Sequence, residues 1–335
     1  TEKAAHEFKM KLHSMDGMDV KPMTISTFHA FCNQLVRDFS QSSDADKLLI
    51  QQNDTAFLLL QNYDRLTFLT SEYFRSNPVE SIKNSFIPFF NRIRDELLSP
   101  DELNQKIENL ALTPESIHNL FPGLNDRISS EEYQKQFQDL IQVYQHYQSW
   151  KDSKGFVDYG DMILDCYNML RQSPKTLELV REKIRHIIID EYQDNNFALN
   201  KIVNLIVEKN PSITVVGDED QCIYSFRGAN YFNITDFRSR YGSLDGYGEV
   251  ELAVNYRSTQ NVLNLANASI SMDHNRTDKT LVSFGEKEGP RPIWHVGEKN
   301  QSLEEIIRLI HNYVFEKGHA FGDIAIICRS IANVR

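Results

Sequence analysis

The sequence predicts an α/β fold with a parallel sheet, an all-helical subdomain inserted into it and the start of a second α/β domain. Two short β-branched runs, Ile187–Ile189 and Ile213–Val216, have the character of strands buried on both faces. Both end abruptly at acidic residues, and in an open α/β sheet this carboxyl edge is where ligands bind. Between residues 40 and 150, helical patterns follow one another with no convincing strand. The chain has 335 residues, so two or three structural units are expected.

The composition narrows the classes of protein. A content of 41% hydrophobic and 25% charged residues is ordinary for a globular chain. The net charge of -11 argues against a protein that wraps duplex DNA non-specifically, because such affinity depends on neutralising phosphates. Any nucleic-acid site must then be a local groove that relies on stacking and a few cations.

The cysteines indicate the cellular compartment of the protein, and the termini indicate whether the chain is complete. The four cysteines form no Cys-x-x-Cys pair, so neither a zinc site nor a disulfide framework is expected. Reduced thiols are typical of a cytoplasmic protein, and no apolar run is long enough to cross a membrane. The chain starts at Thr1 without a signal peptide and stops at Arg335 after a strand-like run, so we expect a piece of a longer protein.

Residues 1–39 predict the first part of the α/β domain. Helical spacing covers Thr1–Leu12, and Met23–Ser26 is strand-like. Ser26 or Thr27 is positioned to cap a second helix, which carries aromatic residues at helical intervals.

Residues 40–150 predict the inserted helical subdomain. Its last helix has an apolar stripe that we expect to form a core rather than a surface for stacking bases. The predicted helices are Asp54–Tyr63, Val79–Leu97, Pro100–Leu110 and Ser130–Lys151. The stripe consists of Tyr133, Phe137, Leu140, Ile141, Tyr144 and Tyr147.

Residues 151–276 predict the return to the α/β domain. In Phe156–Ile163, Asp161 is positioned to cap a helix that begins at Met162. Later elements are the helix Asn230–Tyr241, the buried strand Val250–Val254 and a helix capped by Ser258 or Thr259.

Residues 277–335 predict a linker and the start of a second α/β domain. Thr277–Pro292 contains several glycines and prolines, as linkers do. Beyond it the sequence predicts the opening βαβ unit of that domain. Its parts are the strand Ile293–Val296, the helix Leu303–Val314 and the strand Ile324–Cys328.

Two consecutive carboxylates, Asp190 and Glu191, follow the first buried run. Such a pair suits magnesium, whose hard shell takes one or two carboxylates together with water and substrate phosphates. One carboxylate can then hold the metal while the other orients or deprotonates a water molecule. The alternative for an isolated Asp-Glu pair is a helix start with acidic residues in its first turn.

Three short segments, taken in order, carry a specific resemblance. They are Asp190–Asp194 (Asp-Glu-Tyr-Gln-Asp), Val216–Ala229 (Val-Gly-Asp-Glu-Asp-Gln-Cys-Ile-Tyr-Ser-Phe-Arg-Gly-Ala) and Asn255–Ser258 (Asn-Tyr-Arg-Ser). In this order and spacing they resemble the UvrD/Rep/PcrA group of superfamily-one DNA helicases. The resemblance implies a RecA-like motor domain of the P-loop NTPase kind, with an inserted helical subdomain and a second RecA-like motor domain after it.

The resemblance also implies ATP and Mg²⁺ as ligands of the strand ends. Asp190 would hold magnesium through water, and Glu191 would be the base on the attacking water. Gln221 would contact the γ-phosphate, since an amide can donate to a phosphate oxygen and accept from water. Arg257 would reach the γ-phosphate as well, and Tyr256 beside it would stack on the adenine.

The same resemblance implies a site for single-stranded DNA. Thr27 and His29 would meet the phosphates of the strand. Tyr224, Phe226 and Arg227 would grip its bases, because aromatic faces stack on bases of any sequence. In this group, closure and opening of the motor domains move the single strand 3′→5′ and separate the duplex ahead of it. The implied substrates are single-stranded DNA and single/double-strand junctions, in repair, recombination or replication.

One expected motif is missing from the sequence. No glycine is followed by lysine, so the Gly-x-x-x-x-Gly-Lys-Ser/Thr loop that cradles phosphates is absent. We therefore expect this chain alone to show little or no ATPase or unwinding activity. Two alternatives stay open: a non-catalytic DNA- or partner-binding module of helicase-like architecture, and part of a helicase–nuclease of the AddA/RecB kind. The sequence offers no nuclease carboxylate cluster and does not identify protein partners.

Overall fold

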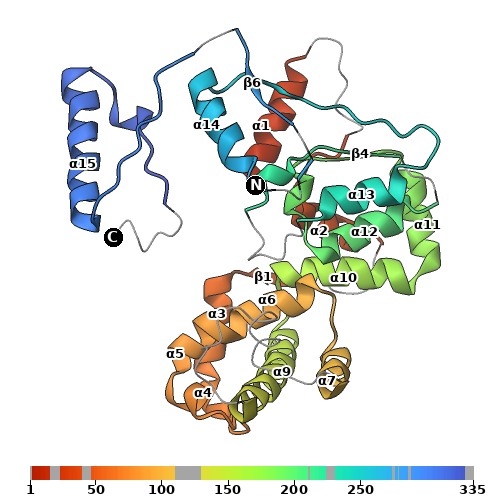
Figure 1. The fold of residues 1–335 in the computed structure, drawn as a ribbon. Coiled ribbons are helices and arrows are strands. Elements are labelled where there is room, and N and C mark those ends of the chain that lie inside the picture. The colour runs from red at the N-terminus through yellow and green to blue at the C-terminus, as the bar shows by residue number, and fades with distance from the viewer. Residues whose placement is uncertain are drawn as a thin grey trace. The chain divides into compact units, whose positions relative to one another are not determined.

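The computed structural model describes residues 2–15, 23–39, 47–109, 130–209, 212–223, 231–273, 276–277, 279–285 and 288–328. The chain divides into two compact units, Thr1–Gly248 and Glu249–Arg335, and each is described by itself. The fold is mixed α/β, with short parallel strand pairs and many helices, as the sequence predicts (Figure 1). None of the helices in the described ranges is long and apolar enough to cross a membrane.

The sheet-bearing part of the first unit packs helices against a short parallel strand pair. Strands β3 (Ile187–Ile189) and β4 (Ile213–Val215) pair residue by residue, and α12 (Phe197–Val207) lies between them in sequence. Val203 of α12 packs against β3. The prediction that both strands are buried on both faces is wrong, because Ile188 is 70% exposed and no further described strand covers this sheet. The other elements here are α1 (Glu2–His13), α2 (Phe28–Phe39), α10 (Tyr159–Gln172), α11 (Pro174–Lys183), α13 (Asn233–Tyr241), and the 3-10 turns η4 (Tyr192–Asp194) and η5 (Glu219–Gln221).

A helical core supports this sheet. Cys32 of α2, Cys166 of α10, Val180 of α11 and Ile202 of α12 are fully buried in one apolar cluster. Burial of these side chains from four helices fixes α2 and α12 on the same core, so the start of α2 and the strand ends belong to one packed body.

Helix α10 begins one turn earlier than the sequence predicts. Asp158 accepts hydrogen bonds from the backbone N–H groups of Gly160 and Asp161, and the Asp161 carboxylate accepts from Asp158 N at 2.8 Å. This reciprocal arrangement is a capping box. The prediction that Asp161 caps a helix starting at Met162 is therefore wrong, since Asp158 satisfies the first free N–H groups and the helix starts at Tyr159.

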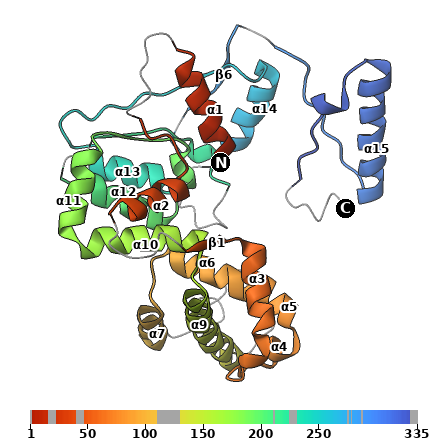
Figure 2. The same ribbon diagram turned by 180° about the vertical axis from the view of Figure 1, so that it is seen from behind.

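The helical subdomain has a core of its own, and its helices gather into one group in both views (Figures 1 and 2). The predicted stripe of α9 (Ser130–Ser153) is buried along its whole length, from Tyr133 to Tyr147. Phe90 lies at the centre of this core, where its ring stacks on Tyr147 at 4.9 Å. The other elements are α3 (Gln52–Gln61), η2 (Tyr63–Arg65), α4 (Glu72–Ser76), α5 (Pro78–Ser81), the π-helical turn η3 (Ile82–Phe86), α6 (Ile87–Asp95) and α7 (Pro100–Asn109).

A strand that the sequence pattern missed lies at the beginning of this subdomain. Strand β1 (Leu48–Ile50) pairs in parallel with β2 (Phe156–Asp158), although no strand was predicted between residues 40 and 150. A run of three residues carries too little periodicity to predict a strand, and only pairing with a distant segment creates it. The pairing holds the start of the helical subdomain beside the segment that follows its last helix, α9.

Four buried charged residues join the helical subdomain to α10. We call Arg94, Lys151, Asp158 and Asp161 the charge cluster; they are between 2% and 6% exposed. Arg94 Nη1 donates to Asp158 Oδ2 at 2.6 Å, and Lys151 Nζ donates to Asp161 Oδ2 at 2.5 Å. Tyr147 donates its hydroxyl to Asp158 Oδ2 at 2.6 Å. Each buried charge is therefore paired and hydrogen-bonded, which is the condition for keeping it away from water.

The second unit has short strands and little core. Strands β5 (Val254–Asn255) and β6 (Val282–Ser283) pair in parallel, and Leu263 of α14 (Gln260–Ile270) is buried. Its remaining described elements are α15 (Lys299–His311), the π-helical turn η7 (Asn312–Glu316) and η8 (Phe321–Asp323).

Several strand predictions are wrong. Met23–Ser26, Ile293–Val296 and Ile324–Cys328 have no strand structure, and of Val250–Val254 only the last residue belongs to a strand. These runs have β-branched or apolar character, but apart from Val254 none of their residues pairs with a neighbouring strand in the described parts of the chain. A strand exists only through hydrogen bonds to a neighbour, so local composition was insufficient.

Candidate functional site

The structure brings the segment after β3 beside the segment after β4. Val216 N donates to Ile189 O at 2.8 Å, and Tyr192 N donates to Val216 O at 2.9 Å, so the parallel pairing continues past the strand ends. Asp190 and Glu191 leave β3, and Gln221 lies shortly after β4. The predicted acidic pair and the predicted amide are therefore at the same carboxyl edge of the sheet.

The acidic pair is exposed and has an unusual backbone. Glu191 has φ 51° and ψ 45°, the left-handed region that few residues with a side chain adopt. Asp190 Oδ1 accepts a hydrogen bond from Glu191 N at 3.1 Å. Neither carboxylate forms an ion pair with any residue in the described ranges. Two carboxylates without an ion pair are hard oxygen donors, a set that fits Mg²⁺ completed by water and phosphate.

Gln193 joins the two segments, and the sequence pattern had assigned it no role. Its amide is buried, donates from Nε2 to Glu191 Oε2 at 2.7 Å and accepts at Oε1 from Asp218 N at 2.9 Å. Asp218 Oδ2 in turn accepts from Gln221 Nε2 at 2.7 Å. An unbroken path of hydrogen bonds thus connects Glu191 to Gln221. The signal was present in the Asp-Glu-Tyr-Gln-Asp segment, where glutamine follows the acidic pair by two residues.

Thr27 and His29 lie at the start of α2. Thr27 Oγ1 accepts from Ala30 N at 3.3 Å, which makes Thr27 the cap of this helix, as predicted. The ring of His29 meets the exposed ring of Tyr159 edge to face, with centroids 5.6 Å apart. Burial lowers the pKa of His29, so the imidazole is neutral near pH 7 and offers a hydrogen bond or an apolar face rather than a charge.

Tyr256 and Arg257 belong to the second unit, and both are exposed. Asn255 Oδ1 accepts from Arg257 N at 2.9 Å and from Ser258 N at 2.7 Å, which shapes the turn that carries them. The ring of Tyr256 packs on Phe284 with centroids 4.6 Å apart. Three other predicted residues, Tyr224, Phe226 and Arg227, lie outside the described residues.

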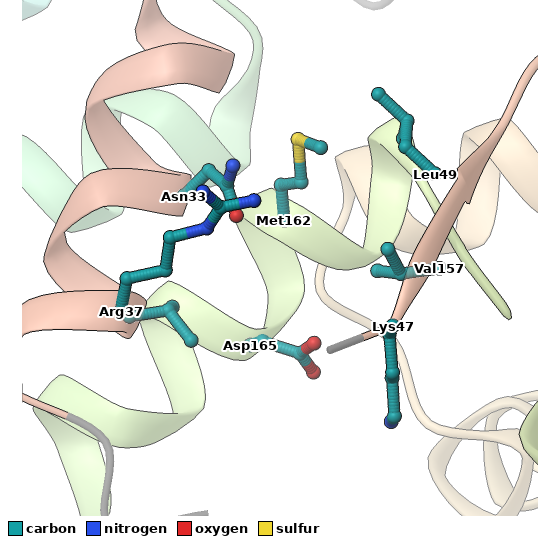
Figure 3. A pocket seen from close by; sticks show the side chains of 8 residues that line it. Asn33, Arg37, Lys47, Leu49, Val157, Met162 and Asp165 are labelled. Carbon is teal, nitrogen blue, oxygen red and sulfur yellow. The ribbon is translucent and has the colours of Figure 1, made fainter. Parts of the chain in front are cut away.

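A small cavity of about 70 Å³ lies between α2, α10 and the β1–β2 pair (Figure 3). Arg37, Lys47 and Asp165 lie on its wall, but none of the predicted site residues does. Its volume is far below the roughly 300–1,000 Å³ typical of small-molecule sites, so it is not a nucleotide pocket. In addition, the described residues contain no group of three or more His, Cys, Asp or Glu side chains that could hold a metal.

Two domain families and several curated relatives match this chain. Residues 1–242 match the UvrD/REP helicase N-terminal domain, and residues 250–335 match the UvrD-like helicase C-terminal domain. The chain is 28% identical to the ATP-dependent DNA helicase PcrA of Staphylococcus epidermidis and 27% identical to that of Staphylococcus aureus. In both cases the similarity covers 100% of this chain and 41% of the relative, so the chain spans about two fifths of the length of these curated relatives. Since the first domain match covers most of its length, the chain belongs to the UvrD/Rep family of helicases.

Proposed function

We propose that this chain provides the magnesium-binding and water-activating part of an ATP-dependent DNA helicase that moves 3′→5′ on single-stranded DNA. The observation that carries the proposal is the hydrogen-bonded path from Glu191 through Gln193 and Asp218 to Gln221 at one sheet edge. This edge is where an open α/β sheet binds its ligand. The names of the relatives point to the same activity.

Asp190 and Glu191 are the residues that would hold Mg²⁺, since both carboxylates are exposed and free of ion pairs in the described ranges. When bound, Mg²⁺ neutralises charge on the phosphates of ATP. Glu191 accepts the proton of the water that attacks the γ-phosphorus. Gln221 donates its second amide N–H to a γ-phosphate oxygen, since the amide has two N–H donors and only one of them bonds Asp218 Oδ2.

In this proposal, Arg257 and Tyr256 of the second unit each contact ATP. The Arg257 guanidinium is exposed and always charged, so it suits the γ-phosphate. Tyr256 is 77% exposed, which leaves its ring accessible for stacking on the adenine.

The DNA site in this proposal combines α2 with the segment that follows Gln221. Thr27 and the neutral His29 contact phosphates of the single strand, and Tyr224, Phe226 and Arg227 contact its bases. Movement along the strand separates the duplex at a single/double-strand junction. The process served is repair, recombination or replication.

The rate of ATP hydrolysis tests the proposal. It is measured on a protein that carries this chain together with a phosphate-binding loop. We expect ATPase activity stimulated by single-stranded DNA, and a decrease in kcat of about 10²–10⁴-fold in Glu191→Gln, because a general base is lost. Glu182→Gln is the matched control, since Glu182 is exposed on α11 and away from the strand ends. DNA-independent turnover, or equal activity of the two variants, would contradict the proposed role.

The direction of movement is tested separately with duplexes that carry a single-stranded tail. A 3′→5′ motor unwinds the duplex with a 3′ tail and not the one with a 5′ tail. Preference for the 5′ tail would leave the hydrolytic site intact and overturn the assigned direction.

A further inference from the structure

Gln193 occupies a position that the proposed chemistry does not explain by itself. Its side chain is 1% exposed, although it lies in η4 immediately after two exposed carboxylates. Its Nε2 donates to Glu191 Oε2 at 2.7 Å, and its Oε1 accepts from the backbone N–H of Asp218 at 2.9 Å. A single planar group therefore bridges the segment after β3 and the segment after β4.

The amide makes both of these contacts without any change in protonation. Glu191 is an acceptor and Asp218 N is a donor, so the bridging side chain must offer a donor and an acceptor at once. The fit is tight, because a Cβ atom added at Gly217 would lie 2.6 Å from Gln193 Oε1. The backbone of Gly217 thus leaves room for this amide and for little else.

The backbone of Gln193 is held as firmly as its side chain. Asn233, which is 1% exposed, donates from Nδ2 to the carbonyl oxygens of Tyr192, Gln193 and Asn195 at 3.3, 3.2 and 2.7 Å. The backbone that carries the Gln193 side chain is therefore fixed in place. Glu191, in contrast, is exposed and has a left-handed backbone conformation that requires support from its surroundings.

We propose that Gln193 is the positioning residue that sets the Glu191 carboxylate against Gln221; this inference rests on the proposed function. Gln193 acts through its two hydrogen bonds to the protein rather than on ATP itself. Its Nε2 holds the Glu191 carboxylate. Its Oε1 is bound to Asp218 N, so the side chain moves together with the segment after β4. A shift of the segment that carries Gln221, caused by γ-phosphate binding, is thereby passed to the base.

Steady-state ATP hydrolysis tests the inference. It is measured on a protein that carries this chain and a phosphate-binding loop. Gln193→Met keeps the length of the side chain but removes both hydrogen bonds. We expect kcat to fall about 10–100-fold, as for the loss of other groups that orient active-site ligands, with KM for ATP changed less than about 3-fold. Gln136→Met is the matched control, because Gln136 is also 1% exposed but lies in α9 of the helical subdomain.

A double-mutant cycle separates positioning from general structural damage. If Gln193 acts through Glu191, then Gln193→Met causes less than about 2-fold further loss in the Glu191→Gln protein, measured in single-turnover hydrolysis. A merely structural role makes the two losses multiply, and that result would overturn the inference.

Hydrogen exchange provides a readout that needs no ATPase activity and uses the 335-residue chain itself. In Gln193→Met the amide of Asp218 loses its acceptor, so we expect it to exchange at least about 10-fold faster. The amide of Leu199, bound to Asn196 Oδ1 at 3.0 Å, is the internal reference and should keep its protection. Unchanged exchange at Asp218 would contradict the bridge.

The two hypotheses fail in different ways. Absence of DNA-stimulated turnover in the unmutated protein overturns the proposed function, and the role of Gln193 in hydrolysis with it. Normal turnover that Gln193→Met leaves within about 2-fold overturns only the positioning role.

Discussion

The charge cluster and the end of β3 both contain two carboxylates, but in opposite surroundings. In the charge cluster, Asp158 and Asp161 are buried and paired with Arg94 and Lys151. At the end of β3, two adjacent carboxylates are exposed and have no ion-pair partner in the described parts of the chain. The protein thus neutralises one set of acids internally and leaves the other set exposed, without an ion pair in the described residues.

The difference shows that the surroundings of a carboxylate, rather than its identity, decide its role. Burial by itself raises the pKa of Asp158, but Arg94 and Lys151 outweigh this effect and hold that pKa well below its usual range. An acid in that state keeps its charge over the ordinary pH range, because two cations and the Tyr147 hydroxyl stabilise its carboxylate. Asp190 is exposed and has no ion-pair partner in the described residues, as the proposed Mg²⁺ site requires.

The largest expected effect comes from breaking the charge cluster. Arg94→Met leaves Asp158 without its nearest cation in a buried site, so we expect the free energy of unfolding to fall by about 3–5 kcal/mol. Arg92→Met is the control on the same helix, because Arg92 pairs with Glu96 at 3.0 Å on the surface. That exposed pair should contribute about 0–1 kcal/mol. Urea unfolding measures both, and equal losses would show that the cluster does not stabilise the helical subdomain.

Asp95 tests the intermediate case of an acid that is partly buried and has no direct ion pair in the described ranges. It accepts from Asn196 Nδ2 at 2.6 Å, and burial raises the pKa of Asp95 to about 6 despite the opposing effect of Arg94. Because the folded pKa lies above the ordinary value of 3.8, stability is fully present below that value and is lost as pH rises through about 6. Asp95→Asn should therefore raise stability by up to about 3 kcal/mol above pH 6 and leave it unchanged below pH 4.

Thermal unfolding between pH 4 and 8 checks this sign. Asp101→Asn is the control, since Asp101 is exposed in α7 and should shift the profile little. A stability difference for Asp95→Asn that grows toward acid pH would contradict the assignment.

The smallest expected effect on folding is at the strand-end acids. Asp190 is exposed and unpaired in the described ranges, so Asp190→Asn should change the free energy of unfolding by no more than about 0.5 kcal/mol. The same substitution at Asp158 should cost several times more, because it removes a charge that Arg94 and Lys151 require. Similar losses in urea unfolding would mean that Asp190 has a structural role.

Much of the fold and part of the site could be predicted from local pattern. The apolar run at Ile187 became β3, the stripe on α9 became core, and Thr27 capped α2. These features depend on periodicity or on a side chain meeting its own helix, so neighbouring residues are sufficient to encode them. The acidic pair after β3 was recognisable for the same reason. The roles of Glu191, Gln221 and Arg257 in the site remain predictions.

By itself, the sequence determined where the apolar runs end and which acids and amides follow them. Only the tertiary structure decided that Leu48–Ile50 is a strand and that Gln193 bridges Glu191 and Asp218. Asp158 likewise pairs with Arg94, which is 64 residues away in sequence. The physical reason is that hydrogen bonds and ion pairs between distant residues leave no local periodicity, and they exist only once packing has brought their partners together.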